Sequence, residues 1–228
     1  MVLEIIVWVD CCFIIMQLDI KEQSLILEGK KYSRKELMSL SANATGDNTS
    51  SFLLDLYRFL ADWFSDSPFM TVHTSGSTGT PKVLTVRKEQ MMQSARMTCE
   101  FLNLHTGDTA LLCMPLQYIA GKMMVVRALV AGLNLILRTP SGHPLADVTV
   151  PLRFVAMVPL QVFNTLQVLR EKERLCHTDI LIIGGGAIDA ALENEIRLLP
   201  GEIYSTYGMT ETLSHIALRR LNGSSASP

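Results

Sequence analysis

The residues best suited to chemistry gather at positions 71–82, which read TVHTSGSTGTPK. Glycine lets the backbone adopt conformations that other residues avoid, so consecutive N–H groups can point inward and form an anion-binding nest. Hydroxyl side chains and the Lys82 cation would complete a cradle for phosphate oxygens. The alternative is a flexible Gly/Ser linker, which the preceding strand-like FMTVHT and the closing Pro81-Lys82 disfavour. The cradle residues are Thr74, Ser75, Gly76, Ser77, Thr78, Gly79 and Lys82.

Three further segments place glycine or polar residues directly after apolar runs: 114–121 (MPLQYIAG), 184–188 (GGGAI) and 206–212 (TYGMTET). Glu211 in the last segment is a candidate metal ligand. A hard dication that bridges phosphates needs oxygen ligands, and carboxylate is the usual choice. The alternative for Glu211 is a solvated surface acid, which is the ordinary role of an isolated glutamate.

Composition and spacing exclude several classes of protein. The 228 residues are 48% hydrophobic and 18% charged, which predicts a globular chain of one or two domains. A net charge of −2 gives no basic footprint for nucleic acid. The five cysteines include no C-x-x-C pair, so we expect neither disulfides nor zinc, and a cytoplasmic location. A Walker A loop from Gly76 would need glycine in place of Pro81, and a dinucleotide fingerprint from Gly184 would need glycine in place of Asp189.

The first residues form an apolar run that is short of the ~20 residues of a membrane span and contains Glu4 and Asp10. A signal peptide would require a positively charged start, but no Lys or Arg precedes Lys21. We therefore expect no stable membrane insertion. Residues 1–15 are interpreted as an upstream extension before Met16, with a buried strand as the alternative.

The elements that must position these segments follow from periodicity. Residues 18–32 predict a hairpin that turns at 28–30, and Ser33 and Glu36 have the spacing of a capping box. A loop is expected at 41–50 and an amphipathic helix from Ser51. Beyond the glycine-rich run, which comprises residues 74–82, strands and helices alternate. This alternation predicts an α/β fold of layered, largely parallel sheets flanked by helices, with ligands at the carboxyl ends of the strands. The expected helices are 88–104, 120–131, 160–172 and 190–199, and the expected strands are TALLCMP, NLILR, RFVAMV, DILIIGG and EIYSTYG.

These motifs resemble those of one family. Residues 74–82 agree with the phosphate loop of the adenylate-forming superfamily, which includes acyl-CoA synthetases, luciferases and peptide-synthetase adenylation domains. YGMTE at 207–211 resembles a hallmark of the same superfamily. Residues 114–121 are similar to its PLFHxxG segment, with Tyr118 where histidine is frequent, and GGGA at 184–187 is similar to its adenine-side turn. Val83 departs from the family, which usually has glycine there.

The resemblance implies an enzyme that joins a carboxylic acid to the α-phosphate of ATP with Mg²⁺ and then transfers the acyl group to a thiol, usually that of coenzyme A. No protein nucleophile is needed, and no serine elbow or Cys/His pair is evident in the sequence. It assigns catalysis to Lys82, Thr210 and Glu211, and the metal to Glu211. The residues it assigns to the nucleotide are, besides the cradle, Gly184, Gly185, Gly186, Ala187, Thr206, Tyr207, Gly208, Met209 and Thr210.

Arg127 bears on which acid is activated, because a cation inside an apolar helix requires an anionic partner. That partner is either an internal Asp or Glu or a second carboxylate on the substrate. An arginine six residues after Gly121 is similar to what o-succinylbenzoate–CoA ligases of menaquinone biosynthesis have, and TYGMTETLSHIALR resembles their corresponding segment. The resemblance assigns the acid to Tyr118, Gly121, Arg127, Gly186, Ser214 and His215.

The predicted domain is an incomplete adenylate-forming large domain at 16–221, with a frayed end at 222–228. Members of the family continue into a carboxyl-terminal lid domain with a catalytic lysine, which this sequence lacks, so we expect little turnover from the chain as written. Two alternatives are a catalytically silent adenylate-binding module and an acyl-CoA synthetase of other specificity. A third, an amino-acid adenylation domain, would need an acid in the pocket, for which Asp189 is the nearest candidate.

Overall fold

A mixed sheet of nine strands forms the centre of the computed structural model, which describes residues 4–5, 19–43, 50–74, 82–213 and 215–223. Within these residues the strand order is β1-β11-β10-β9-β8-β6-β7-β2-β3, and β4 and β5 form a separate two-stranded sheet. The strands are β1 (Glu4–Ile5), β2 (Ser24–Leu27), β3 (Lys30–Ser33), β4 (Phe69–His73), β5 (Val83–Arg87), β6 (Thr109–Leu112), β7 (Asn134–Leu137), β8 (Leu152–Met157), β9 (Thr178–Ile183), β10 (Glu202–Gly208) and β11 (His215–Arg220).

The middle of this sheet is parallel and its edges are antiparallel. Strands β10, β9, β8, β6, β7 and β2 pair in parallel, whereas β3, β11 and β1 pair antiparallel with their neighbours. The central strands are continuous apolar runs buried on both faces, as parallel strands covered by helices are. The predicted α/β class is confirmed.

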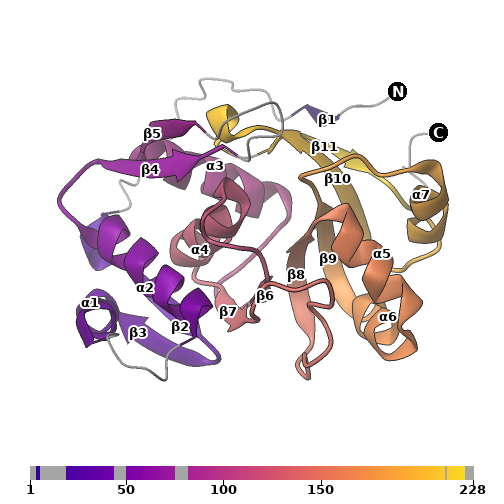
Figure 1. Cartoon of the computed structure of the whole chain (residues 1–228), viewed down its shortest axis with the longest axis horizontal. Helices are drawn as coiled ribbons and strands as arrows, with labels where there is room; N and C mark the ends of the chain where they lie inside the picture. The colour runs from indigo at the N-terminus through magenta and orange to yellow at the C-terminus, as the bar shows by residue number, and fades with distance from the viewer. Residues whose placement is uncertain (1–3, 6–18, 44–49, 75–81, 214, 224–228) are drawn as a thin grey trace.

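Helices cover the sheet at both ends of the strand order (Figure 1). The first two lie beside β2 and β3, and the last three lie beside β9 and β10. Between them, α3 packs against α4. The helices are α1 (Arg34–Asn43), α2 (Ser51–Phe64), α3 (Lys88–Phe101), α4 (Ile119–Ala131), α5 (Pro159–Gln167), α6 (Leu169–Cys176) and α7 (Ala190–Ile196), with 3-10 turns η1 (Ile20–Glu22) and η2 (Thr210–Thr212). None of the described helices combines the length and apolar character that a membrane crossing requires.

The predicted hairpin, capping box and amphipathic helix are confirmed. The hairpin of β2 and β3 turns at Glu28 and Gly29, both of which have positive φ. The capping box forms as expected: the Glu36 carboxylate accepts from the Ser33 N–H at 2.8 Å, and the Ser33 Oγ accepts from the Glu36 N–H at 3.4 Å. Helix α2 buries the face that periodicity indicated, which consists of Phe52, Leu56, Phe59, Leu60 and Trp63.

Several boundaries differ from the prediction. The helix expected at 160–172 is two helices, because the chain leaves helical geometry at Val168, where φ is −112° and ψ is 111°. Helix α1 extends to residue 43 into the predicted loop, whose positions 44–49 lie outside the described residues. Neither β5 nor β11 was expected. Of the proposed extension, only the short strand β1 is described, paired with β11.

The glycine-rich run does not join strands of the nine-stranded sheet that carries the other site segments. It connects β4 to β5, which pair only with each other among the described strands. Strands β4 and β5 thus form a hairpin, whose last described backbone contact before the run is Thr74 N–H to Lys82 O at 3.0 Å. Hydrogen bonding along β4 and β5 holds the ends of the run together, and residues 75–81 lie outside the described residues.

Candidate functional site

A cavity of about 380 Å³ opens at the carboxyl ends of β6, β8, β9 and β10, the edge where the strand order predicts ligands. Most of its wall is apolar, and a few polar groups converge on it, as in small-molecule sites. Its lining residues are His73, Met114, Pro115, Tyr118, Ile119, Ala120, Arg127, Ala156, Met157, Val158, Ile182, Gly184, Gly185, Thr206, Gly208, Met209, Thr210, Leu213 and His215.

The glycine turn after β9 shapes one wall of the cavity. Gly184 N–H donates to Met157 O at 3.1 Å, which continues the ladder of β8 and β9 past the last strand residue. A Cβ at Gly184 would lie 2.3 Å from the Thr206 Oγ1, so glycine permits the close approach of β10 at this point. The turn thus brings Gly184, Gly185 and Thr206 to one side of the cavity.

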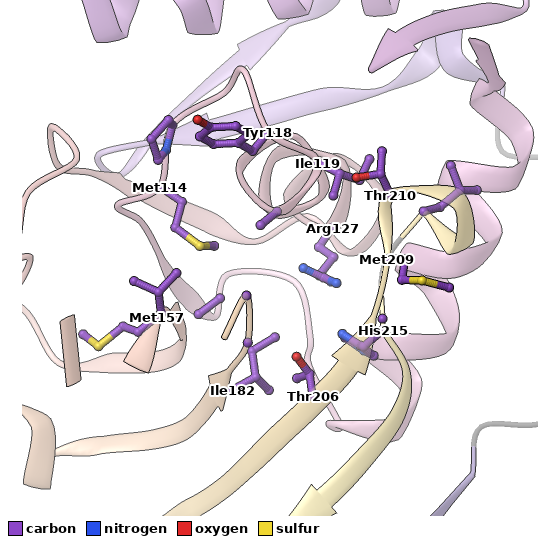
Figure 2. A pocket seen from close by; sticks show the side chains of 18 of the residues that line it. Met114, Tyr118, Ile119, Arg127, Met157, Ile182, Thr206, Met209, Thr210 and His215 are labelled. Atoms are coloured by element: carbon purple, nitrogen blue, oxygen red, sulfur yellow. The ribbon is translucent and has the colours of Figure 1, made fainter. Parts of the chain in front are cut away.

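Arg127 supplies a buried cation to the opposite wall. Its residue is 2% exposed, and its guanidinium points into the cavity from α4 (Figure 2). Nη1 lies 3.7 Å from the Met124 Sδ. Burial lowers the pKa of Arg127 to about 10, against a smaller opposing effect of the Cys99 thiol. The side chain therefore stays protonated at neutral pH and presents a positive charge to whatever occupies the cavity.

His215 lies next to Arg127 and faces the same space (Figure 2). Its Nε2 lies 3.1 Å from the Oγ1 of Thr98, a buried residue of α3. Burial, and then the charge of Arg127, lower the pKa of His215 to about 3. The imidazole is therefore uncharged at neutral pH.

The shifted pKa of His215 predicts a pH-dependent stability. In the unfolded chain the imidazole binds a proton below its ordinary pKa of 6.5, whereas in the folded chain it does so only near 3. The free energy of unfolding should therefore fall as the pH drops from 6.5 towards 3, by at most about 1.4 kcal/mol per pH unit from this group. Urea unfolding of the wild type and of His215→Gln at about pH 7.5 and about pH 5 measures it. The variant should lose less stability on acidification, and equal losses in the two proteins would contradict the shift.

The hairpin of β4 and β5 is attached to this cavity by two contacts. His73 at the end of β4 pairs with Tyr118 in a parallel bridge, and the Lys122 Nζ donates to Thr71 O at 2.7 Å. Burial lowers the pKa of Lys122, and Asp62 opposes that effect. At the end of the hairpin where the glycine-rich run connects the strands, Lys82 N–H donates to the Thr74 Oγ1 at 2.9 Å. The glycine-rich run therefore leaves and re-enters the hairpin next to the cavity wall.

The structure brings together part of the predicted site. The predicted residues that line the cavity are Tyr118, Arg127, Gly184, Gly185, Thr206, Gly208, Met209, Thr210 and His215. Those that are described but do not line it are Thr74, Lys82, Gly121, Gly186, Ala187, Tyr207 and Glu211. Those outside the described residues are Ser75, Gly76, Ser77, Thr78, Gly79 and Ser214.

The predicted residues outside the cavity lie beside lining residues in sequence. Tyr207 and Glu211 are exposed on either side of the segment that carries Met209 and Thr210 into the cavity. Their side chains are therefore exposed to solvent, one or two residues away in sequence from residues that line the cavity. Gly121 packs behind the wall, against the carbonyls of residues 114 and 115.

Several lining residues had no place in the sequence prediction. Met157, Val158 and Ile182 lie at the ends of β8 and β9, a position that the strand pattern could have flagged. His73 directly precedes the glycine-rich run. Leu213, buried with φ of 66°, has a backbone conformation that the sequence does not signal.

The fold and the site define a class of protein. The sequence profile of the family described as AMP-binding enzyme matches residues 9–227, and the chain belongs to this family of adenylate-forming proteins. A solved structure described as acyl-CoA synthetase (AMP-forming)/AMP-acid ligase II-like protein from Dyadobacter fermentans is 35% identical, with a TM-score of 0.76 over 86% of this chain and 55% of that one.

Among curated relatives, the 2-succinylbenzoate–CoA ligase of Haemophilus influenzae is 29% identical over 168 residues, which cover 73% of this chain and 36% of the relative. That of Enterococcus faecalis is 31% identical over 152 residues, which cover 64% of this chain and 30% of the relative. The chain thus spans about a third of the length of these curated relatives. The O-succinylbenzoate coenzyme A synthetase of Bacillus subtilis, solved in complex with ATP and magnesium ion, shares the fold at 17% identity, with a TM-score of 0.63 over 93% of this chain and 63% of that one.

Proposed function

We propose that this chain binds ATP with Mg²⁺ and activates an apolar carboxylic acid that carries a second carboxylate, such as o-succinylbenzoate, for transfer to coenzyme A. The observation that carries the proposal is the Arg127 guanidinium, buried in an otherwise mostly apolar cavity that also contains Gly185 and Thr210. A buried cation favours an anionic partner in the same space. The names of the curated relatives support the choice of acid.

In the proposed reaction, a carboxylate oxygen of the acid forms a bond to the α-phosphorus of ATP, and the bond from that phosphorus to the pyrophosphate oxygen breaks. The thiol sulfur of coenzyme A then attacks the acyl carbon, and AMP leaves with the electron pair of the broken C–O bond. The protein's part is to hold two anions together and to neutralise charge. Arg127 would hold the second carboxylate of the acid, and Lys82 and backbone N–H groups would meet the phosphates.

Glu211 suits the magnesium ion that such a reaction uses. Its side chain is exposed in η2, one residue after Thr210, which lines the cavity. Magnesium is held in proteins by one or two carboxylates together with substrate phosphates. Bound there, it would neutralise phosphate charge, and Glu211 would be its protein ligand.

The cavity's charge argues against an amino acid as the substrate. No Asp or Glu is among the described residues that line the cavity, so nothing there would meet an ammonium group. Asp189, the candidate for that role, caps helix α7 instead: its Oδ1 accepts from Leu192 N–H at 2.8 Å. The acidic candidate is therefore engaged outside the cavity.

Calorimetry of the chain with ATP–Mg²⁺ and with o-succinylbenzoate, followed by a pyrophosphate-release assay, tests the proposal. We expect both ligands to bind, and Glu211→Gln to weaken binding of ATP–Mg²⁺ by about 10-fold, since one charge-assisted metal ligand is lost. The matched control is Glu195→Gln, which removes the charge of an exposed acid on α7 and should change nothing. Failure of ATP–Mg²⁺ to bind would overturn the proposal. Binding of ATP without the acid, and without pyrophosphate release, would favour a silent nucleotide-binding module.

A further inference from the structure

A residue behind the cavity wall, Thr98 of α3, determines how His215 can bond. The Thr98 side chain is buried, with 2% of the residue exposed. Its Oγ1 donates to the carbonyl of Ser94, one turn earlier in the helix, at 3.0 Å. The same oxygen lies 3.1 Å from the His215 Nε2. Thr98 itself does not line the cavity, so it acts on a ligand only through His215.

Counting protons along this chain of bonds fixes the imidazole tautomer. A threonine hydroxyl has one proton and two acceptor lone pairs. With the hydroxyl donating to the Ser94 carbonyl, we assign the Oγ1 as the acceptor of a hydrogen bond from the His215 Nε2. A neutral imidazole has one N–H, which must then be on Nε2 and not on Nδ1.

The environment of His215 favours the neutral ring on which this count depends. Arg127 places a positive charge close by, and the site is largely buried, so a second proton on the imidazole is opposed by repulsion and by desolvation. His215 is also the first residue of β11, and it pairs with Gly208 of β10 where the strand register is irregular. Between these partners, residues 209, 210 and 213 enter the cavity, so the position of His215 fixes one end of that segment.

We propose that Thr98 is a positioning residue whose hydroxyl holds His215 in one orientation as the uncharged Nε2–H tautomer, so that Arg127 meets the anionic acid beside a neutral imidazole. The tautomer and orientation are argued from the two contacts of the Thr98 hydroxyl. The effect on the acid rests on the proposed function.

Nitrogen-15 NMR of the imidazoles, together with calorimetry, tests the proposal on the chain itself. Thr98→Val keeps the shape but removes the hydroxyl, and Thr98→Ser, the matched control, keeps the hydroxyl. In the wild type and in Thr98→Ser we expect His215 to be protonated on Nε2 alone at neutral pH. In Thr98→Val we expect both tautomers, and an affinity for o-succinylbenzoate about 10-fold weaker, as the loss of one hydrogen bond gives. The affinity for ATP–Mg²⁺ should stay the same in all three.

Two results would overturn the proposal: an Nδ1–H tautomer in the wild type, or a Thr98→Val protein with an unchanged tautomer and an unchanged affinity for the acid. If Thr98→Val does not fold, the wild-type and Thr98→Ser spectra still decide the tautomer. If the expected tautomer changes are seen but no variant binds the acid, the role of Thr98 towards His215 is supported and the proposed substrate is wrong.

Discussion

Replacing Arg127 with methionine is expected to weaken binding of o-succinylbenzoate by about 100-fold and to leave the affinity for ATP–Mg²⁺ unchanged. Removing one partner of a buried charge pair costs about 2–5 kcal/mol, much of it because the other charge stays buried. At 1.4 kcal/mol for each factor of ten, about 100-fold lies within that range. Calorimetric titration of the acid into the wild type and the variant measures the change.

The same substitution is expected to raise the free energy of unfolding. Burial is the largest influence on the pKa of Arg127 and lowers it, which means that the folded protein holds this cation at a cost. Removing a buried charge also removes its desolvation penalty, which is several kcal/mol for each buried ion. Urea unfolding should therefore show Arg127→Met to be about 1 kcal/mol more stable than the wild type. A residue that lowers stability and is kept in a cavity is typical of a binding site.

The variant Arg127→Lys distinguishes the contribution of the positive charge to acid binding from that of the planar guanidinium group. Lysine keeps the positive charge but lacks the planar fork that binds both oxygens of a carboxylate, so we expect a loss of acid affinity of about 10-fold. If Arg127→Met bound the acid as tightly as the wild type, the second carboxylate would not lie at this residue. If it were several kcal/mol less stable, the internal carboxylate that the sequence left open as a partner would be the better explanation.

The central strands and the position of the cavity could be predicted because both depend on local patterns. A parallel strand covered on both faces is a continuous apolar run, as in DILII of β9, and a ligand edge follows wherever such runs end in glycine or polar residues. Gly184, Thr206 and Thr210 come together for this reason. Their local sequence carries nearly all the information that is needed.

What could not be predicted depends on contacts between distant parts of the chain. Thr98 lies 117 residues from His215, and nothing near Thr98 marks it as different from other polar residues on a helix. Strand β5 was missed because its residues alternate between partly buried and exposed, and its only partner among the described strands is β4 across the glycine-rich run. The break at Val168 has no glycine or proline to signal it.

Gly121→Ala is expected to destabilise the fold and to disturb the cavity together with it. A Cβ at this position in α4 would lie 2.4 Å from the carbonyl oxygen of Pro115 and 2.9 Å from that of Met114. Both atoms are backbone, so no rotamer change relieves the contact, and either α4 or the segment that precedes it must move. Forcing an extra methyl group into a well-packed site costs about 1–3 kcal/mol. Unfolding in urea should show a loss in the upper part of that range.

Gly142→Ala is a matched control that shows whether the loss of stability depends on the added methyl group contacting backbone atoms and not a side chain. At Gly142, a Cβ would lie 2.8 Å from the Asn164 Nδ2, which is the far end of a flexible side chain, and would meet no backbone atom within 4 Å. Gly142→Ala should therefore cost less than about 1 kcal/mol. Because Met114 and Pro115 line the cavity and Arg127 lies further along α4, Gly121→Ala should also weaken acid binding, whereas Gly142→Ala should not. Equal stability losses in the two variants would mean that the segment before α4 yields easily, and Gly121 would then have no special part in shaping the cavity.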